Sequence, residues 1–104
     1  MIQINVFVPE EHTERVKASM FQAGGGKFGN YDSCCFEHPG VGQFRPLDGS
    51  NAFIGKVGAV EKVREVKIEM ICEEKFLQAV IIAMKKSHPY ERPAFYAFKT
   101  LDNL

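Results

Sequence analysis

The stretch KVREVKIEMIC, residues 62–72, carries the clearest structural pattern of the sequence. Apolar and charged residues alternate along it, as they do in a β-strand with one buried and one exposed face. The expected buried face consists of Val66, Ile68, Met70 and Cys72, and the opposite face of Glu65, Lys67 and Glu69. The stretch therefore predicts a strand that packs one face against a core.

An amphipathic helix is expected directly after this strand, over residues 73–87 (EEKFLQAVIIAMKKS). Glutamates begin it and lysines end it, as the helix dipole prefers. Pro89 prevents the helix from continuing, and residues 94–101 (AFYAFKTL) predict a last strand. The apolar stripe of the helix consists of Phe76, Leu77, Val80, Ile81 and Met84.

The N-terminal half has the same order of elements. Residues 2–8 (IQINVFV) predict a strand, and Pro9 suits the first turn of a helix because its missing N–H costs nothing there. The helix stripe is Val16, Met20 and Ala23, and three glycines at 24–26 end the helix, since glycine adopts the left-handed cap conformation easily.

The middle of the chain is expected to form a hairpin. Residues 31–40 (YDSCCFEHPG) predict a short strand that Pro39 and Gly40 close, and residues 41–47 (VGQFRPL) predict the strand that pairs with it. Residues 48–60 contain too many turn-forming residues to be regular throughout.

The order strand, helix, two or more strands, helix, strand predicts an α+β fold. Two helices on one face of a mixed, mainly antiparallel sheet would bury every apolar stripe, which is the ferredoxin-like, or split βαβ, sandwich. A chain of 104 residues with 45% apolar residues can build one core but hardly two. We therefore expect a single domain over residues 1–104.

Composition excludes several classes of partner. Thirteen basic and thirteen acidic residues give a formal net charge of zero, without the basic excess that nucleic-acid binding requires. No apolar run is long enough to cross a bilayer, and the N-terminus lacks the pattern of a signal peptide. Three cysteines are an odd number and do not form a disulfide scaffold, which favours a reducing, cytoplasmic location.

The glycine-rich stretch AGGGKFGNY, residues 23–31, does not satisfy the pattern of a phosphate loop. Phe28 stands where that loop needs Ser or Thr, Phe21 stands at its first glycine, and the stretch follows a helix. We interpret it as a helix cap and a loop, although backbone amides of its glycines remain candidates for contacting an anion.

Metal-ligand spacing is weak throughout the sequence. Cys34 and Cys35 would point to opposite faces of a regular strand, and His38 would lie about 13 Å from Cys34 along it. His12 would need partners from elsewhere or from another subunit. A metal site therefore requires donors that are distant in the sequence or come from two copies.

The stretch KKSHPYERPAFYAF, residues 85–98, is the most distinctive candidate site. Pro89 and Pro93 fix two backbone angles around Tyr90 and Glu91, so that His88, the tyrosine and the carboxylate would project in fixed directions. The alternative is that this turn only redirects the chain and that Tyr90 covers the core.

Several of these motifs resemble one known family. The stretch HPYERPAFYAF resembles the HPYEEPA-type motif that ends the domain inserted into Nif-three-like proteins (the NGG-one interacting factor family). The preceding motifs also resemble that insert, in the same order: Gly29-Asn30-Tyr31, a cysteine-containing strand, the pattern G-x-G-x-F-x-P in residues 40–46, Phe53-Ile54-Gly55, and residues 65–69. The chain is similar to a stand-alone, YqfO-like version of the insert.

The resemblance implies a CutA/PII-like fold and self-association, with a trimer favoured over a dimer. It does not imply the hydrolase activity suggested for the full-length family, because the chain lacks the histidine-rich two-metal core. Arg92 also stands where the motif often has a second glutamate. The ligand-binding candidates are Gly25, Gly26, Lys27, Asn30, Tyr31, Arg45 and Tyr90, and the metal candidates, for a divalent ion, are His88, Glu91, Cys34 and His38.

Two functions from different classes are therefore expected. The first is a non-enzymatic, oligomeric binding or sensing module for a metal ion or small ligand in clefts between subunits. The second is an interaction module that docks on a separate, metal-dependent Nif-three-like core protein. A small enzyme is less favoured, because no nucleophile–base pair can be assembled from the sequence; its acid–base candidates would be His88 and Glu91.

Overall fold

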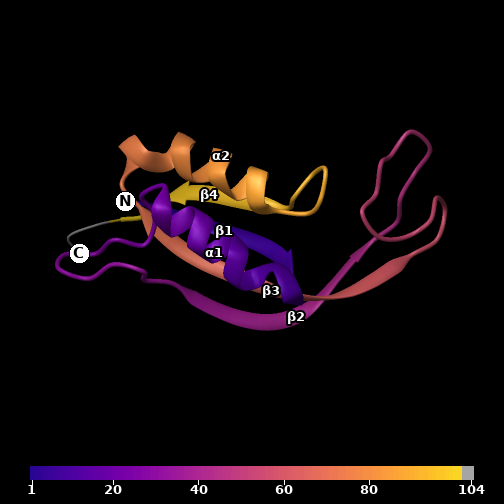
Figure 1. Ribbon diagram of the computed structural model, residues 1–104, viewed down its shortest axis with the longest axis horizontal. Coiled ribbons are helices and arrows are strands. Elements are labelled where there is room, and N and C mark those ends of the chain that lie inside the picture. Colours follow the sequence, from indigo (N-terminus) through magenta and orange to yellow (C-terminus); the bar gives the residue numbers. More distant parts are fainter. Residues whose placement is uncertain (102–104) are drawn as a thin grey trace.

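The computed structural model of the chain describes residues 1–101 (Figure 1). The single domain expected from the sequence comprises residues 1–104, of which residues 102–104 lie outside the described part. Short 3₁₀ turns, η1 (Glu10–His12) and η2 (Glu74–Phe76), precede the two helices. The elements in chain order are β1 (Ile2–Pro9), α1 (Thr13–Gln22), β2 (Phe36–Phe44), β3 (Glu61–Cys72), α2 (Leu77–Ser87) and β4 (Phe95–Lys99).

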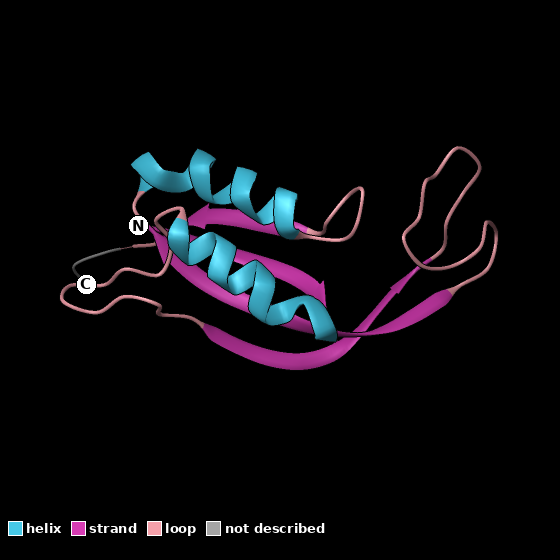
Figure 2. Ribbon diagram, in the orientation of Figure 1, coloured by secondary structure: helices cyan, strands magenta, loops and turns pink. Residues whose placement is uncertain are grey.

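The four strands form one sheet in the order β2-β3-β1-β4, and all three pairs are antiparallel. Both helices lie on one face of this sheet (Figure 2). The expected ferredoxin-like fold is confirmed. The sheet is more uniform than the mixed sheet that we expected, because the described strands contain no parallel pair.

The core lies between the sheet and the helices, where the sequence pattern placed it. The alternation along β3 buries Val66, Ile68, Met70 and Cys72 and places Glu65, Lys67 and Glu69 on the other face, as predicted. Hydrogen bonds also join the helices: the Ser19 hydroxyl donates to the Ala83 carbonyl at 3.0 Å, and the Arg15 guanidinium donates to the Ser87 carbonyl from Nε at 3.0 Å and from Nη2 at 2.7 Å. The buried apolar residues are Ile2, Ile4, Val6, Val8, Val16, Met20, Val66, Ile68, Met70, Cys72, Val80 and Met84.

The prediction of a hairpin within residues 31–47 is wrong. Pro39 and Gly40 do not close a strand but lie inside β2, where they pair with Val66 and Glu65 of β3. Prolines within sheets occur mainly on edge strands, which pair on one side only, and β2 is an edge strand. The true hairpin is β2–β3, and the residues between these strands form its tip.

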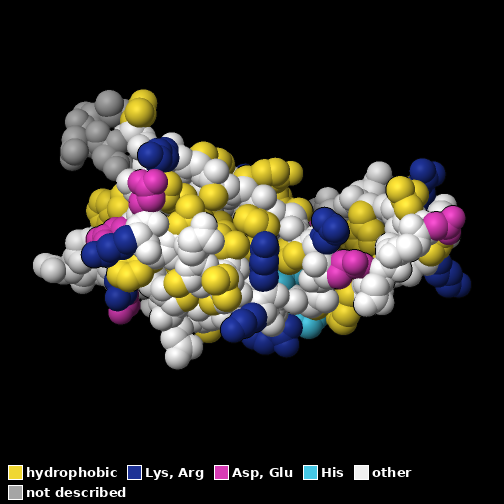
Figure 3. All heavy atoms as spheres, turned by 90° about the horizontal axis from the view of Figure 1, so that it is seen from above, with side chains coloured by type: hydrophobic (Ala, Val, Ile, Leu, Met, Phe, Trp, Pro, Cys, Tyr) yellow, Lys and Arg dark blue, Asp and Glu magenta, His cyan; other side chains and the backbone are white. Residues whose placement is uncertain are grey.

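This hairpin makes the molecule elongated, with extents of 46 × 24 × 23 Å. We call its tip, residues 45–60, the arm; it extends beyond the helices at the right of Figure 1. Figure 3 shows that basic and acidic side chains are interspersed on the face seen there, along both the body and the arm. Among the described residues, neither helix is both long enough and apolar enough to cross a membrane.

Candidate functional site

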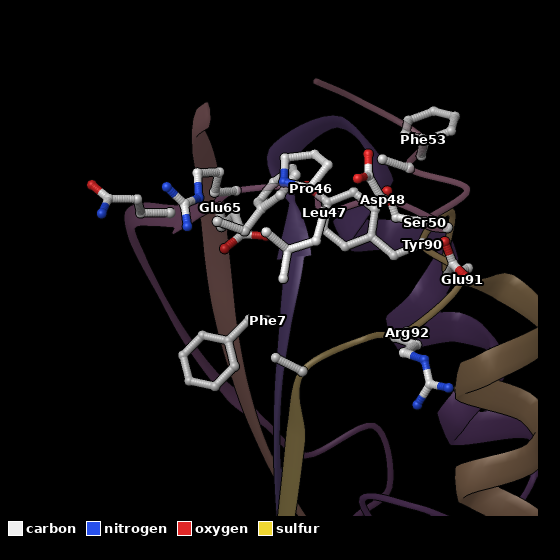
Figure 4. A pocket seen from close by; sticks show the side chains of 16 residues that line it. Phe7, Pro46, Leu47, Asp48, Ser50, Phe53, Glu65, Tyr90, Glu91 and Arg92 are labelled. Atoms are coloured by element: carbon white, nitrogen blue, oxygen red, sulfur yellow. The ribbon is translucent and has the colours of Figure 1, made fainter. Parts of the chain in front are cut away.

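A cavity of about 600 Å³ lies where the base of the arm meets the turn between α2 and β4. We call that turn, residues 88–94, the proline turn. Figure 4 shows side chains from β1, β3, the arm and the proline turn around this space, which has the size of a small-ligand site. Its lining consists of Phe7, Gln43, Phe44, Arg45, Pro46, Leu47, Asp48, Gly49, Ser50, Ala52, Phe53, Glu65, Tyr90, Glu91, Arg92 and Ala94.

Tyr90 is the centre of an aromatic cluster in this pocket. Its ring lies 5.8 Å from Phe44, 6.3 Å from Phe53 and 5.1 Å from His88, measured between centroids. The Tyr90 hydroxyl is buried and has no hydrogen-bond partner within the described chain. Burial, and then the negative charge of nearby glutamates, of which Glu65 contributes most, raise the pKa of Tyr90 to about 12. A buried hydroxyl without a partner is costly, so it indicates a missing hydrogen-bonding group.

His88 fixes the proline turn to the sheet. Its Nε2 lies 2.8 Å from the Phe7 carbonyl, and the Tyr90 N–H donates to its Nδ1 at 3.1 Å. A carbonyl can only accept and an N–H can only donate, so the ring is neutral and carries its proton on Nε2. Desolvation is the main reason why the pKa of His88 is lowered from 6.5. Both ring nitrogens are therefore already used inside the fold.

The charged residues of the pocket differ in their exposure. Arg45, Asp48, Glu91 and Arg92 are exposed, whereas Glu65 on β3 is half-buried. The Asn51 N–H donates to the Glu91 carboxylate at 2.5 Å, which joins the arm to the proline turn. Burial raises the pKa of Glu65.

The predicted ligand-binding residues are divided between two ends of the molecule. Arg45 and Tyr90 line the pocket, whereas Gly25, Gly26, Lys27, Asn30 and Tyr31 lie in the loop between α1 and β2, at the left of Figure 1. Two of the glycine amides are already engaged, because the Gly25 N–H donates to Met20 and the Gly26 N–H to Ile71. Those two amides are therefore not available to an anion.

The four predicted metal ligands are also dispersed. His88 and Glu91 are in the proline turn, Cys34 precedes β2, and His38 lies on β2 with its Nε2 3.6 Å from a Glu69 carboxylate oxygen. Within residues 1–101 there is no group of three or more His, Cys, Asp or Glu side chains that could hold a metal ion. The described donors of one copy are therefore not grouped as metal ligands, and a metal held between copies stays a prediction.

A second feature is the face of the sheet opposite the helices, which we call the open face. Its apolar side chains include three strongly exposed rings: Phe36 is 65% exposed, Tyr96 60% and Phe98 47%. Phe7 lies on the same face, with its ring edge toward Tyr96 at 6.2 Å. No helix of the described residues covers this face (Figure 2).

Most residues of the pocket could not be recognised as a site from the sequence. The sequence pattern places Phe7 and Phe44 on predicted strands, Phe53 in an irregular segment, and Glu65 on the exposed side of a strand, without indicating that they meet. The alternation of β1 and β3 could have placed Phe7 and Glu65 on one face, since both oppose the buried set. The approach of the arm to the proline turn depends on long-range folding and has no local signal.

No family model matches the chain. It is 48% identical over 95 residues to the GTP cyclohydrolase 1 type 2 homolog of Halalkalibacterium halodurans, and 46% identical over 93 residues to that of Bacillus subtilis. These matches cover 91% and 89% of this chain but 26% and 25% of the relatives. The chain thus spans about a quarter of the length of the curated relatives it matches.

Solved structures extend this similarity. A Bacillus cereus protein related to NIF3 superposes with a TM-score of 0.83 at 39% identity, over 98% of this chain and 26% of that protein. The periplasmic divalent cation tolerance protein CutA of Archaeoglobus fulgidus gives 0.69 at 18% identity, over 100% and 88%. The PII-like protein CutA of a Nostoc species gives 0.68 at 19%, over 96% and 81%. The last two similarities show the fold alone.

Proposed function

This chain is a homologue of one segment of the Nif-three-like proteins, and from that premise we propose that it is a non-enzymatic, oligomeric binding module. The module takes up a small ligand in the pocket between the arm and the proline turn. The buried hydroxyl of Tyr90, which has no partner within residues 1–101, is the observation that carries this proposal. A ligand that satisfies the hydroxyl would remove the cost of leaving it unpaired.

The same residues favour binding over catalysis. A pKa of about 12 keeps the Tyr90 hydroxyl protonated at neutral pH, so it is a poor acid–base group. Both nitrogens of His88 are held by backbone groups. The Tyr90 hydroxyl and the His88 ring are therefore suited to hydrogen bonding and not to proton transfer.

Self-association is supported by the open face. Large exposed apolar patches mark interaction sites, and the exposed rings of Phe36, Tyr96 and Phe98 lie on one uncovered side of the sheet. A second copy would cover these rings. The pocket borders this face through Phe7, so a neighbouring copy would lie close to its opening.

A small organic ligand is favoured over a divalent cation. The solved CutA protein of Archaeoglobus fulgidus is described as a divalent cation tolerance protein. Within residues 1–101 the metal donors are dispersed, whereas the pocket combines rings and aliphatic groups with polar and charged side chains at its edge, an arrangement that suits an organic ligand. The hypothesis of a metal site would need donors from two copies of the chain.

Titration calorimetry of the purified protein with divalent metal chlorides, ATP, simple organic acids and simple amines tests the proposal. We expect at least one organic compound to bind, and its binding to be lost in Ala52→Trp, where the indole fills the pocket. Val57→Trp is the control, because Val57 is an exposed arm residue that does not line the pocket. Failure of every compound to bind the folded protein would contradict the proposal, as would equal binding by the two variants.

The alternative function, docking on a separate Nif-three-like core protein, is favoured by one observation. The relatives join a segment like this chain to about three quarters of further sequence. Chromatography of the chain mixed with such a core protein at micromolar concentration tests it. Co-elution would support docking, and separate elution of both folded proteins would argue against it.

A further inference from the structure

Glu65 is an unpaired carboxylate in the same pocket as the unpaired hydroxyl of Tyr90. Its carboxylate has no hydrogen bond or ion pair with any described residue, and the residue is half-buried between the pocket and a smaller hollow on the open face. Glu65 and Tyr90 line the same pocket, and the negative charge of Glu65 helps to raise the pKa of Tyr90. A half-buried carboxylate without a protein donor is only partly hydrated. It would therefore gain free energy from a ligand that donates a hydrogen bond to it.

The fold makes room for this carboxylate with a glycine. A Cβ atom at Gly42 of β2 would overlap Oε1 of Glu65, so the carboxylate lies directly against the backbone of that glycine. Gly42 has no positive φ, which means that its conformation does not require glycine. The absent side chain at position 42 therefore determines where the carboxylate lies.

The other charged side chains of the pocket are more exposed to solvent than Glu65. Arg45, Asp48, Glu91 and Arg92 are exposed and hydrated, so they gain little from a ligand. The half-buried groups around Glu65 are aromatic, namely Phe7, Phe44 and Tyr90. Aromatic faces next to a carboxylate attract a cation, whereas they repel an anion.

We propose that the pocket binds an organic amine, with the ammonium group donating to Glu65 and to the Tyr90 hydroxyl oxygen. The carbon skeleton of the amine lies among Phe7 and Leu47, which Figure 4 shows, and Phe44, which lines the same space. The inference rests on the proposed function, because it names the class of ligand for the same pocket. Charge-assisted hydrogen bonds of this kind are stronger than neutral ones.

Three small aromatic probes separate this ligand class from others: benzylammonium and benzyl alcohol, which have nearly the same shape, and benzoate, which carries an anionic group of similar size. Their binding to the full chain at pH 7 is measured by NMR titration of the backbone amides. We expect benzylammonium to bind at least about tenfold more tightly than benzyl alcohol, from the extra strength of a charged hydrogen bond. Benzoate is expected to bind more weakly than either.

Four variants test the assignment of atoms. Glu65→Gln keeps the shape but removes the charge, and should weaken benzylammonium by about ten- to a hundredfold with little effect on benzyl alcohol. Gly42→Ala should weaken it similarly, because the new methyl group displaces the carboxylate. Tyr90→Phe should weaken it by about threefold or more. Gly40→Ala is the matched control, since a Cβ there meets nothing within 4 Å on the same strand.

The outcomes distinguish this inference from the function on which it rests. Tightest binding by benzoate in the pocket, or unchanged binding by Glu65→Gln, would overturn the amine assignment and leave a small-ligand module. Equal weakening by Gly42→Ala and Gly40→Ala would also overturn it. If none of the three probes and none of the calorimetry compounds binds, both the inference and the proposed function fail.

Discussion

Replacing His88 by alanine is expected to lower the free energy of unfolding by about 2–4 kcal/mol. The imidazole is only 6% exposed and satisfies two backbone groups, the Phe7 carbonyl and the Tyr90 N–H. Without the ring, both groups are buried without partners beside a cavity. Urea unfolding followed by circular dichroism measures the change.

The matched control is His38→Ala. His38 lies on the open face and its side chain is about half exposed, so its loss should shift the urea midpoint much less. Equal shifts in the two variants would show that His88 does not hold the proline turn. Such a result would also remove the reason for treating the turn as a rigid wall of the pocket.

The same histidine makes stability depend on pH. Its pKa in the folded chain is lowered from 6.5, chiefly by burial, with smaller contributions from His12 and Arg15. The unfolded chain therefore binds a proton first as the pH falls below about 6.5, and stability is lost from that point downward. Urea midpoints between pH 8 and pH 5 should fall in the native chain and fall less in His88→Ala.

The second large effect is expected from a charge on the open face. Tyr96→Glu places a carboxylate among the exposed rings, and an oligomer that buries this position would have to desolvate it. We expect the dissociation constant of the oligomer to rise by about a hundredfold or more, since an uncompensated buried charge costs several kcal/mol. Sedimentation velocity over a concentration series measures it.

The matched control for this substitution is Ile82→Glu. Ile82 is also a large exposed apolar residue, at 52%, but it lies on α2 and not on the open face. Its substitution should leave the assembly unchanged. A native chain that sediments as a monomer at micromolar concentration would contradict the proposed self-association, and dissociation by Ile82→Glu alone would place the interface on the helices.

The fold could be predicted because local patterns agree with the tertiary structure. Alternation along β3 and the stripe of α2 each identify one buried face, and packing these faces together leaves few arrangements. The error at Pro39 and Gly40 has a physical origin. Their turn preference is a local property, whereas the edge position of β2, which tolerates a proline, is decided by the whole sheet.

The candidate site was less predictable for the same reason. The proline turn could be recognised from Pro89, Tyr90 and Pro93, because rigid turns have a local signal. The role of His88 could not, since its partner Phe7 is 81 residues away and belongs to the backbone of β1. The isolation of Glu65 likewise depends on the absence of a side chain at Gly42, on a different strand.

Phe7 belongs both to the wall of the pocket and, through its edge contact with Tyr96, to the open face. Filling the cavity and joining two copies are therefore expected to act on one shared ring. Thermodynamic linkage then requires reciprocity. If ligand binding strengthens the association of copies by some factor, association strengthens ligand binding by the same factor. Such a chain would report the concentration of its ligand as a change in the number of associated copies.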